Sequence, residues 1–96
     1  MPAVELARSA VADLESLIRT HSLPDDTRVR VRTRLAVLGQ FPQIGPALTG
    51  RWEGFRFILG PWRWMVLVYI YMEEEDRVVV VTIEDGRRSG AAAGSR

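Results

Sequence analysis

The longest predominantly apolar stretch of the chain lies at residues 62–72. It reads Trp-Arg-Trp-Met-Val-Leu-Val-Tyr-Ile-Tyr-Met and carries a single charge, Arg63. β-Branched and aromatic residues without Gly or Pro favour a strand, and continuous apolarity is typical of a strand covered on both faces. A helix of this length is too short to cross a bilayer, which takes roughly 20 apolar residues. We therefore predict a central strand over residues 62–72.

Two further apolar stretches flank this strand. Residues 55–59 precede it across a Gly-Pro turn, and residues 77–83 follow it after the acidic run 73–76. Strands joined by such short turns pair antiparallel, so the pattern predicts a three-stranded meander. Side chains alternate between the faces of a strand. We expect the Phe and Trp side chains to pack on the helices, which leaves Arg56 and Arg63 on the opposite, open face.

The N-terminal third of the chain has a different period. Apolar residues recur every three or four positions between residues 7 and 18, which is typical of an amphipathic helix. Ser9 is the expected cap of this helix. His21, in the loop that follows, is expected to be a surface residue.

The next segment allows two interpretations. Residues 28–35 alternate Arg with Val, Thr or Leu, as an exposed strand would. Two Asp after Pro24 are a helix-start signal, and Gly39 is a stop signal. We predict a helix over about 25–39 that pairs with the first as an antiparallel hairpin. Its arginines would then spread around the outer surface.

The order of elements gives the fold class. A short strand at residues 3–6, two helices and the meander predict an α+β fold in which a helical hairpin covers one face of the sheet. Residues 40–53 are rich in Gly and Pro and predict a loop. We expect one domain over 1–88 and a flexible tail over 89–96, which is low in complexity.

Composition excludes several classes of site. The 96 residues include no Cys and one His, so disulfides, thiolate metal sites and His-cluster zinc sites are excluded, and we predict neither metal nor cofactor. No signal peptide is visible in residues 1–20, and no segment is expected to enter a membrane; we expect a cytosolic bacterial protein.

The net charge of +1 hides an uneven distribution. Residues 28–63 hold seven Arg and one acid, Glu53. Such a segment can attract phosphate or an acidic protein. The alternative is a solvated helix face.

Four pieces of the chain resemble, in order and spacing, the RelE/ParE superfamily of bacterial type II toxins. They are Val-Glu-Leu-Ala-Arg-Ser-Ala at 4–10, Leu-Gly-Gln-Phe-Pro at 38–42, Leu-Thr-Gly at 48–50 with Gly-Phe-Arg at 54–56 and Trp-Arg at 62–63, and Asp-Gly-Arg-Arg at 85–88. The resemblance implies a compact toxin that a cognate antitoxin neutralises in a hetero-oligomer. It also implies one of two targets: RelE-type members cut mRNA on the ribosome, and ParE-type members poison DNA gyrase.

The resemblance also implies where a nuclease site would lie. Cutting RNA through the ribose 2′-OH needs a base, an acid and cations for the phosphorane charge. Arg56, Arg63 and Arg88 match the basic positions of the family. Ile58 stands where a nuclease tends to have a second basic residue, and no Tyr or His follows Arg88. Without a base and an acid, the sequence favours a ParE-like gyrase poison; an mRNA endonuclease and a non-toxic antitoxin-binding module are the alternatives.

Candidate binding residues lie outside this trio. Arg28 and Arg32, with their neighbours in the second helix, would complement an acidic antitoxin segment. Trp52 could anchor a partner, or could fold back as a lid on the core. Arg87 could substitute for Arg88, or could belong to a bare tail patch. Arg56 and Arg63 could instead pair with acids and stabilise the edge of the sheet.

Overall fold

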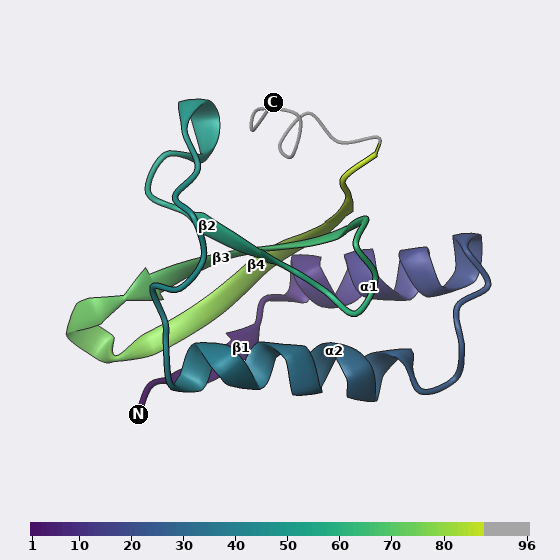
Figure 1. Cartoon of the computed structure of the whole chain (residues 1–96), viewed down its shortest axis with the longest axis horizontal. Coiled ribbons are helices and arrows are strands. Elements are labelled where there is room, and N and C mark those ends of the chain that lie inside the picture. The colour runs from purple at the N-terminus through teal and green to yellow at the C-terminus, as the bar shows by residue number, and fades with distance from the viewer. Residues whose placement is uncertain (88–96) are drawn as a thin grey trace.

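The computed structural model describes residues 1–87, so Arg88 and the predicted tail 89–96 lie outside the described residues. The first half of the chain holds β1 (Ala3–Leu6), α1 (Arg8–Thr20) and α2 (Thr27–Leu35). The second half holds β2 (Arg56–Leu59), β3 (Met65–Met72) and β4 (Arg77–Asp85). The connections contain the 3-10 turns η1 (Ala36–Gly39), η2 (Gly50–Trp52) and η3 (Glu73–Glu75) (Figure 1).

The strands form one mixed sheet of four in the order β1-β4-β3-β2. β2, β3 and β4 pair antiparallel, which confirms the predicted meander. β1 joins the far side of β4 in parallel, with Val4 opposite Val78. Parallel neighbours require a long crossover, and the helical hairpin with β2 and β3 supplies it.

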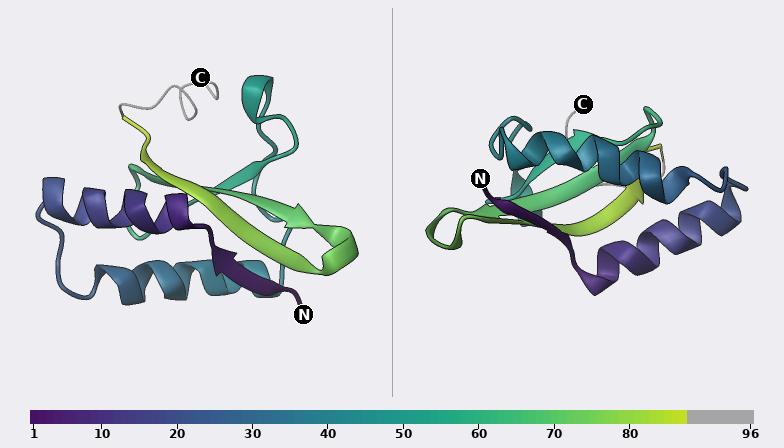
Figure 2. Two further views of the ribbon diagram at one scale, coloured as in Figure 1. Left: turned by 180° about the vertical axis from the view of Figure 1, so that it is seen from behind. Right: turned by 90° about the horizontal axis from the view of Figure 1, so that it is seen from below.

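Both helices pack on the same side of the sheet and run antiparallel, as Figures 1 and 2 show, which confirms the α+β hairpin prediction. α1 begins one residue before Ser9, and Ala7 occupies its N-cap position without a side-chain bond. The Ser9 hydroxyl instead donates to the carbonyl of Val81, so the prediction that Ser9 caps the helix was wrong. The second predicted helix is α2 continued by η1, so its last turn is 3-10. None of the helices in residues 1–87 is long and apolar enough to span a membrane.

The prediction of which sheet face meets the helices was wrong. The main core joins helix residues such as Leu14 and Val31 to Ile58, Leu67 and Tyr69 of the sheet. Arg56 and Ile58 are two positions apart in β2 and therefore share one face of the strand. Arg56 thus lies on the helix side of β2 and not on an open face.

The opposite face carries a second, smaller core. Val66, Val68 and Phe57 lie there, together with Trp52 from the loop that precedes β2. A loop therefore covers the face that the sequence assigned to the helices. β3 also begins at Met65, so the two tryptophans before it belong to the turn and do not follow its alternation. Both pack instead against the main core on the helix side.

Candidate functional site

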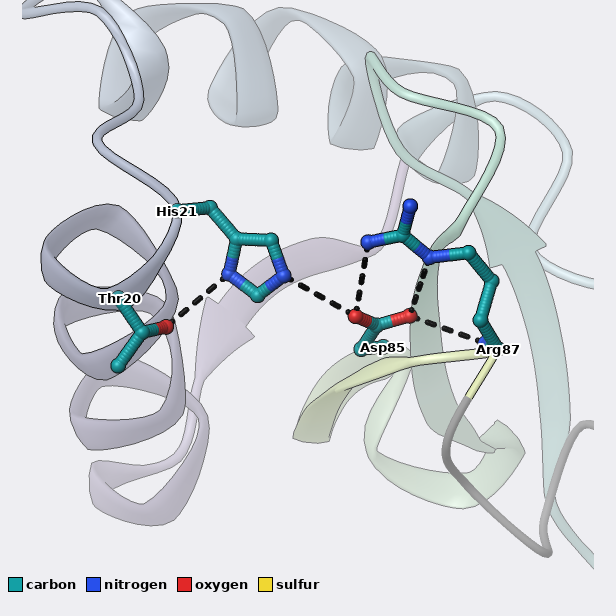
Figure 3. Close-up of polar contacts among 4 residues, drawn as sticks. All are labelled: Thr20, His21, Asp85 and Arg87. Atoms are coloured by element: carbon teal, nitrogen blue, oxygen red, sulfur yellow. Dashed lines mark hydrogen bonds and ion pairs between the residues drawn. The ribbon is translucent and has the colours of Figure 1, made fainter.

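Charged and aromatic side chains gather at the end of the sheet where β4 finishes. We call this the sheet-end cluster and define it by His21, Trp64, Asp85 and Arg87. Figure 3 shows three of these residues, His21, Asp85 and Arg87, together with Thr20. His21 follows α1, Trp64 comes from the turn before β3, and the other two stand at the end of β4 and just after it. Three segments that are distant in the sequence therefore meet in this cluster.

Asp85 is the centre of the cluster. Its side chain is only 6% exposed, and four donors surround it. Oδ1 accepts from the backbone N–H of Arg87 at 2.9 Å and from its Nε at 3.1 Å. Oδ2 accepts from Nη2 of Arg87 at 3.0 Å and lies 3.1 Å from Nε2 of His21. The guanidinium of Arg87 holds the pKa of the Asp85 carboxyl well below its usual range, and the hydrogen bond from His21 acts in the same direction.

His21 is not the surface residue that the sequence predicted. Its side chain is 20% exposed, and its ring stacks on Trp64 with centroids 4.6 Å apart and planes 15° apart. Its other nitrogen, Nδ1, lies 3.0 Å from the hydroxyl of Thr20. A neutral ring that carries its proton on Nε2 satisfies both contacts, because it donates to Asp85 and accepts from Thr20.

Aromatic and cationic groups extend the cluster toward α2. The guanidinium of Arg87 lies 5.0 Å from the ring centroid of Trp64, and Trp62 lies 6.3 Å from the same ring. Arg30 of α2 stands over Trp62 at 5.7 Å. Cations over indole faces are stabilising, so this series of contacts stabilises the packing of the β2–β3 turn against α2.

A second feature lies between the helices. We call it the interhelical groove; it has a volume of about 300 Å³ and is lined by Leu6, Val11, Leu14, Glu15, Arg28, Val31 and Arg32. Its floor is apolar, and Val11 is 45% exposed there. Arg28 forms a bidentate ion pair with Glu15, which lowers the pKa of that carboxyl.

The alternating arginines of α2 form two pairs. At about 100° per residue, Arg28 and Arg32 lie on one side of the buried stripe, and Arg30 and Arg34 lie on the other. The first pair borders the interhelical groove. The second pair faces the β2–β3 hairpin, where Nε of Arg34 donates to the carbonyl of Leu59 at 2.7 Å. The two pairs therefore face different surfaces.

Arg56 is half-buried and hydrogen-bonded to the main chain of the loop before β2. Its Nη1 donates to the carbonyls of Gly45 at 2.8 Å and Gln43 at 3.3 Å. Tyr69, its partner across the sheet, accepts a hydrogen bond from the N–H of the same Gly45 at 3.1 Å. Arg56 therefore clamps the loop before β2.

Arg63 lies at the other end of the β2–β3 hairpin. It is exposed in the turn, and no hydrogen bond or ion pair within residues 1–87 involves its side chain. The strand β2 separates it from Arg56 by roughly 10 Å at about 3.3 Å per residue. Arg63 precedes β3 and lies in no strand, so it does not share a strand face with Arg56, and Arg88 falls outside the described residues.

The sequence allowed two roles for Trp52, a partner anchor or a lid that folds back on the core. In the structure Trp52 packs on the second core. Its ring packs on Phe55 with centroids 5.3 Å apart, and both belong to the second core. Its indole N–H is buried and donates to no group within residues 1–87. A role for Trp52 as a partner anchor stays a prediction.

The two features differ in chemistry. The groove offers an apolar floor with a basic rim. The sheet-end cluster offers a fixed guanidinium and an imidazole on one carboxylate.

Among residues 1–87, no group of three or more acidic or His side chains could hold a metal ion. Sequence reasoning missed His21 and the acceptor role of Asp85, since the two are 64 positions apart.

Comparison with known families adds to this geometry. The family described as ParE toxin of type II toxin–antitoxin system, parDE, matches residues 4–90. No curated protein has a significantly similar sequence.

Solved structures share the fold at low identity. A chain of the intact E. coli RelBE toxin–antitoxin complex aligns with a TM-score of 0.64 and 15% identity, over 88% of this chain and 96% of that chain. A chain of the chromosomal ParDE system from P. aeruginosa aligns with a TM-score of 0.67 and 13% identity, over 88% and 96%. A chain of the RelBE2 complex from Mycobacterium tuberculosis aligns with a TM-score of 0.63 and 21% identity, over 88% and 99%.

Proposed function

Because the chain belongs to the family of ParE toxins of type II toxin–antitoxin systems, we propose that it is a cytoplasmic toxin that arrests growth by binding DNA gyrase. A cognate antitoxin would neutralise it in a hetero-oligomer. The position of Arg56 carries the choice of binding over cutting. Nη1 of Arg56 donates to the carbonyls of Gln43 and Gly45, and these contacts support a role in holding the loop over a role as a cation for the phosphorane.

The target is tested by assays on the purified chain and by one assay in cells that express it. A gyrase poison should inhibit supercoiling in vitro and induce the DNA-damage response in cells. A nuclease should instead cut mRNA in a translation extract. Cutting without any effect on supercoiling would reject the proposed target.

One observation favours the nuclease as a second candidate. His21 supplies an imidazole oriented by Asp85 at 3.1 Å and close to the guanidinium of Arg87. Its Nδ1 accepts from Thr20, so a proton would reach the ring through that hydroxyl. An imidazole held by a carboxylate is a common general base. If this candidate holds, His21→Ala and Arg63→Ala should each reduce cutting strongly, and Arg56→Ala should reduce it only as far as it reduces folding.

We propose the interhelical groove as the antitoxin site. Its apolar floor suits one face of an amphipathic helix, and Arg28 and Arg32 at its rim suit acidic residues on that helix. Val11, 45% exposed, offers an apolar contact to the antitoxin helix near the N-terminal end of α1. Arg32 makes no ion pair or hydrogen bond within residues 1–87, so an acidic partner would not have to displace one.

This site is tested with the product of the adjacent reading frame as the probe. Arg32→Glu should weaken its binding about tenfold or more, since like charges across an interface cost several kcal/mol. Arg63→Glu makes the same charge change outside the groove and should bind as the wild type does. Equal affinities of the two variants would reject the groove. A chain that binds the antitoxin but leaves growth unaffected would support the non-toxic binding module.

A further inference from the structure

Among the arginines of residues 1–87, Arg87 alone donates to one carboxylate from both its side chain and its backbone N–H. Its Nε and Nη2 both donate to Asp85, its backbone N–H donates to the same carboxylate, and its side chain is still 60% exposed. The guanidinium also lies over Trp64 at 5.0 Å. Within residues 1–87, no hydrogen bond reaches its Nη1. The side chain is therefore fixed on one edge and exposed on the other.

The carboxylate that fixes Arg87 is itself fixed from α1. Asp85 is the last residue of β4, and His21 holds its carboxylate: Nε2 contacts Oδ2 at 3.1 Å while the ring is stacked on Trp64. The contact of Thr20 with Nδ1 fixes the second ring nitrogen. The arrangement forms a chain of contacts from α1 through His21 and Asp85 to Arg87 (Figure 3).

We propose that His21 and Asp85 are positioning residues that hold the guanidinium of Arg87 ready to bind an anionic group on the target of the toxin. This inference rests on the proposed role as a growth-arresting toxin, but not on gyrase as the target. Arginine loses less conformational freedom on binding when its fork is already oriented. The exposed edge of the guanidinium suits a carboxylate or a phosphate, and neither His21 nor Asp85 touches that group.

Substitutions separate this role from a role in stability. Arg87→Ala should raise the expression level needed for growth arrest about tenfold, as expected for one lost charge-assisted hydrogen bond. Asp85→Asn should cause a loss of similar size, because an amide cannot accept the bidentate contact. His21→Phe keeps a ring on Trp64 but removes the Nε2 donor, so it should cause a smaller loss. Arg8→Ala and Glu74→Gln, both exposed and outside the cluster, are the matched controls.

A double variant tests whether Asp85 acts through Arg87. If it does, Asp85→Asn adds no further loss to Arg87→Ala. A side-chain ¹⁵N spectrum supplies a second readout: the wild type should show a protected Nε–H resonance for Arg87, and Asp85→Asn should remove it at a temperature where the variant remains folded. His21→Phe should broaden it.

Each outcome decides the matter. Additive losses, or an Arg87 resonance unchanged in Asp85→Asn, would overturn the positioning role. Full growth arrest by Arg87→Ala would overturn it as well. A wild-type chain that arrests growth without inhibiting supercoiling would reject gyrase and leave this inference intact. Phosphate-containing and carboxylate-containing target surfaces are separated by adding a short DNA duplex or an acidic peptide to the ¹⁵N sample and following the Nε–H shift.

Discussion

The hydroxyl of Tyr69 lies 3.1 Å from the backbone nitrogen of Gly45 and accepts its hydrogen bond inside the core. Tyr69 is fully buried, and burial raises the pKa of its phenol, so the ring stays neutral. The carbonyl of the same Gly45 accepts from Arg56 at 2.8 Å. Two residues that face each other across β2 and β3 therefore pair both main-chain groups of one loop residue.

Gly45→Ala should be strongly destabilising. A Cβ atom at this position would lie 2.2 Å from the carbonyl oxygen of Phe57 and 2.9 Å from the hydroxyl of Tyr69. The first of these is backbone and cannot turn away, so the loop must move off the sheet. Overpacking of this kind costs about 1–3 kcal/mol or more, measured by urea unfolding. Gly39→Ala is the control, since its Cβ would meet nothing closer than 3.8 Å; an equal loss in both variants would contradict the clash.

Tyr69→Phe should destabilise the fold by about 1–3 kcal/mol, because it leaves the buried N–H of Gly45 without an acceptor. The ring and its packing stay the same, so the change isolates the hydroxyl. Tyr71→Phe is the matched control: its hydroxyl donates to Asp76 at the surface and should matter little. The urea midpoints of the two variants should therefore separate. If they coincide, water replaces the Tyr69 hydroxyl as the acceptor.

The hydrophobic pattern predicted the element order because each strand and helix carries its own period. It could not predict which face of β3 meets the helices, since both faces are covered. Leu67 and Tyr69 meet α1 and α2, while Val66 and Val68 meet a loop that folds back over the sheet. Two faces of equal apolarity carry no signal about what covers them. The assignment of faces relied on Trp62 and Trp64. These two residues belong to the turn before β3, so they do not indicate which face of the strand meets the helices.

The candidate site was less predictable than the fold. The two-residue spacing of Asp85 and Arg87 was visible in the sequence, but their ion pair depends on the backbone turn after β4. His21 reaches Asp85 only because α1 lies along β4, which is a tertiary contact. Arg56 matched a family position by its motif, yet alternation places it on the covered side. The sequence motifs identified which arginines were candidates for the site. Which of them are held by other groups of the protein depends on tertiary packing.

Arg56→Ala should therefore lower stability and leave growth arrest per folded molecule unchanged. Removing a charged donor from two carbonyls costs about 1–2 kcal/mol. Chemical denaturation gives the stability, and growth arrest is compared at equal amounts of folded protein. Arg63→Ala is the control that should leave stability unchanged, since it sits exposed in a turn. A specific loss of growth arrest in Arg56→Ala, at unchanged stability, would restore Arg56 to the functional site.

Asp85 should make the stability of the fold sensitive to acid. Arg87 and His21 hold the pKa of the folded carboxyl well below its usual range. In the unfolded chain the same group titrates near its ordinary pKa of about 3.9. Below that pH the unfolded state binds a proton that the folded state does not. The contribution of Asp85 is therefore complete above about pH 4 and is lost as the pH falls toward the folded pKa.

Urea unfolding at pH 7 and pH 3 measures this contribution. Asp85→Asn cannot titrate, so its stability deficit relative to the wild type should be largest at pH 7 and should shrink at pH 3. Glu15→Gln is the comparison, because the pKa of Glu15 is also lowered, by Arg28, but at an exposed site where solvent screens the pair. Its deficit should be small at both values. A deficit of Asp85→Asn that is the same at both values would mean that its carboxylate is not held ionised by Arg87 and His21, because only a group with a shifted pKa links proton binding to folding.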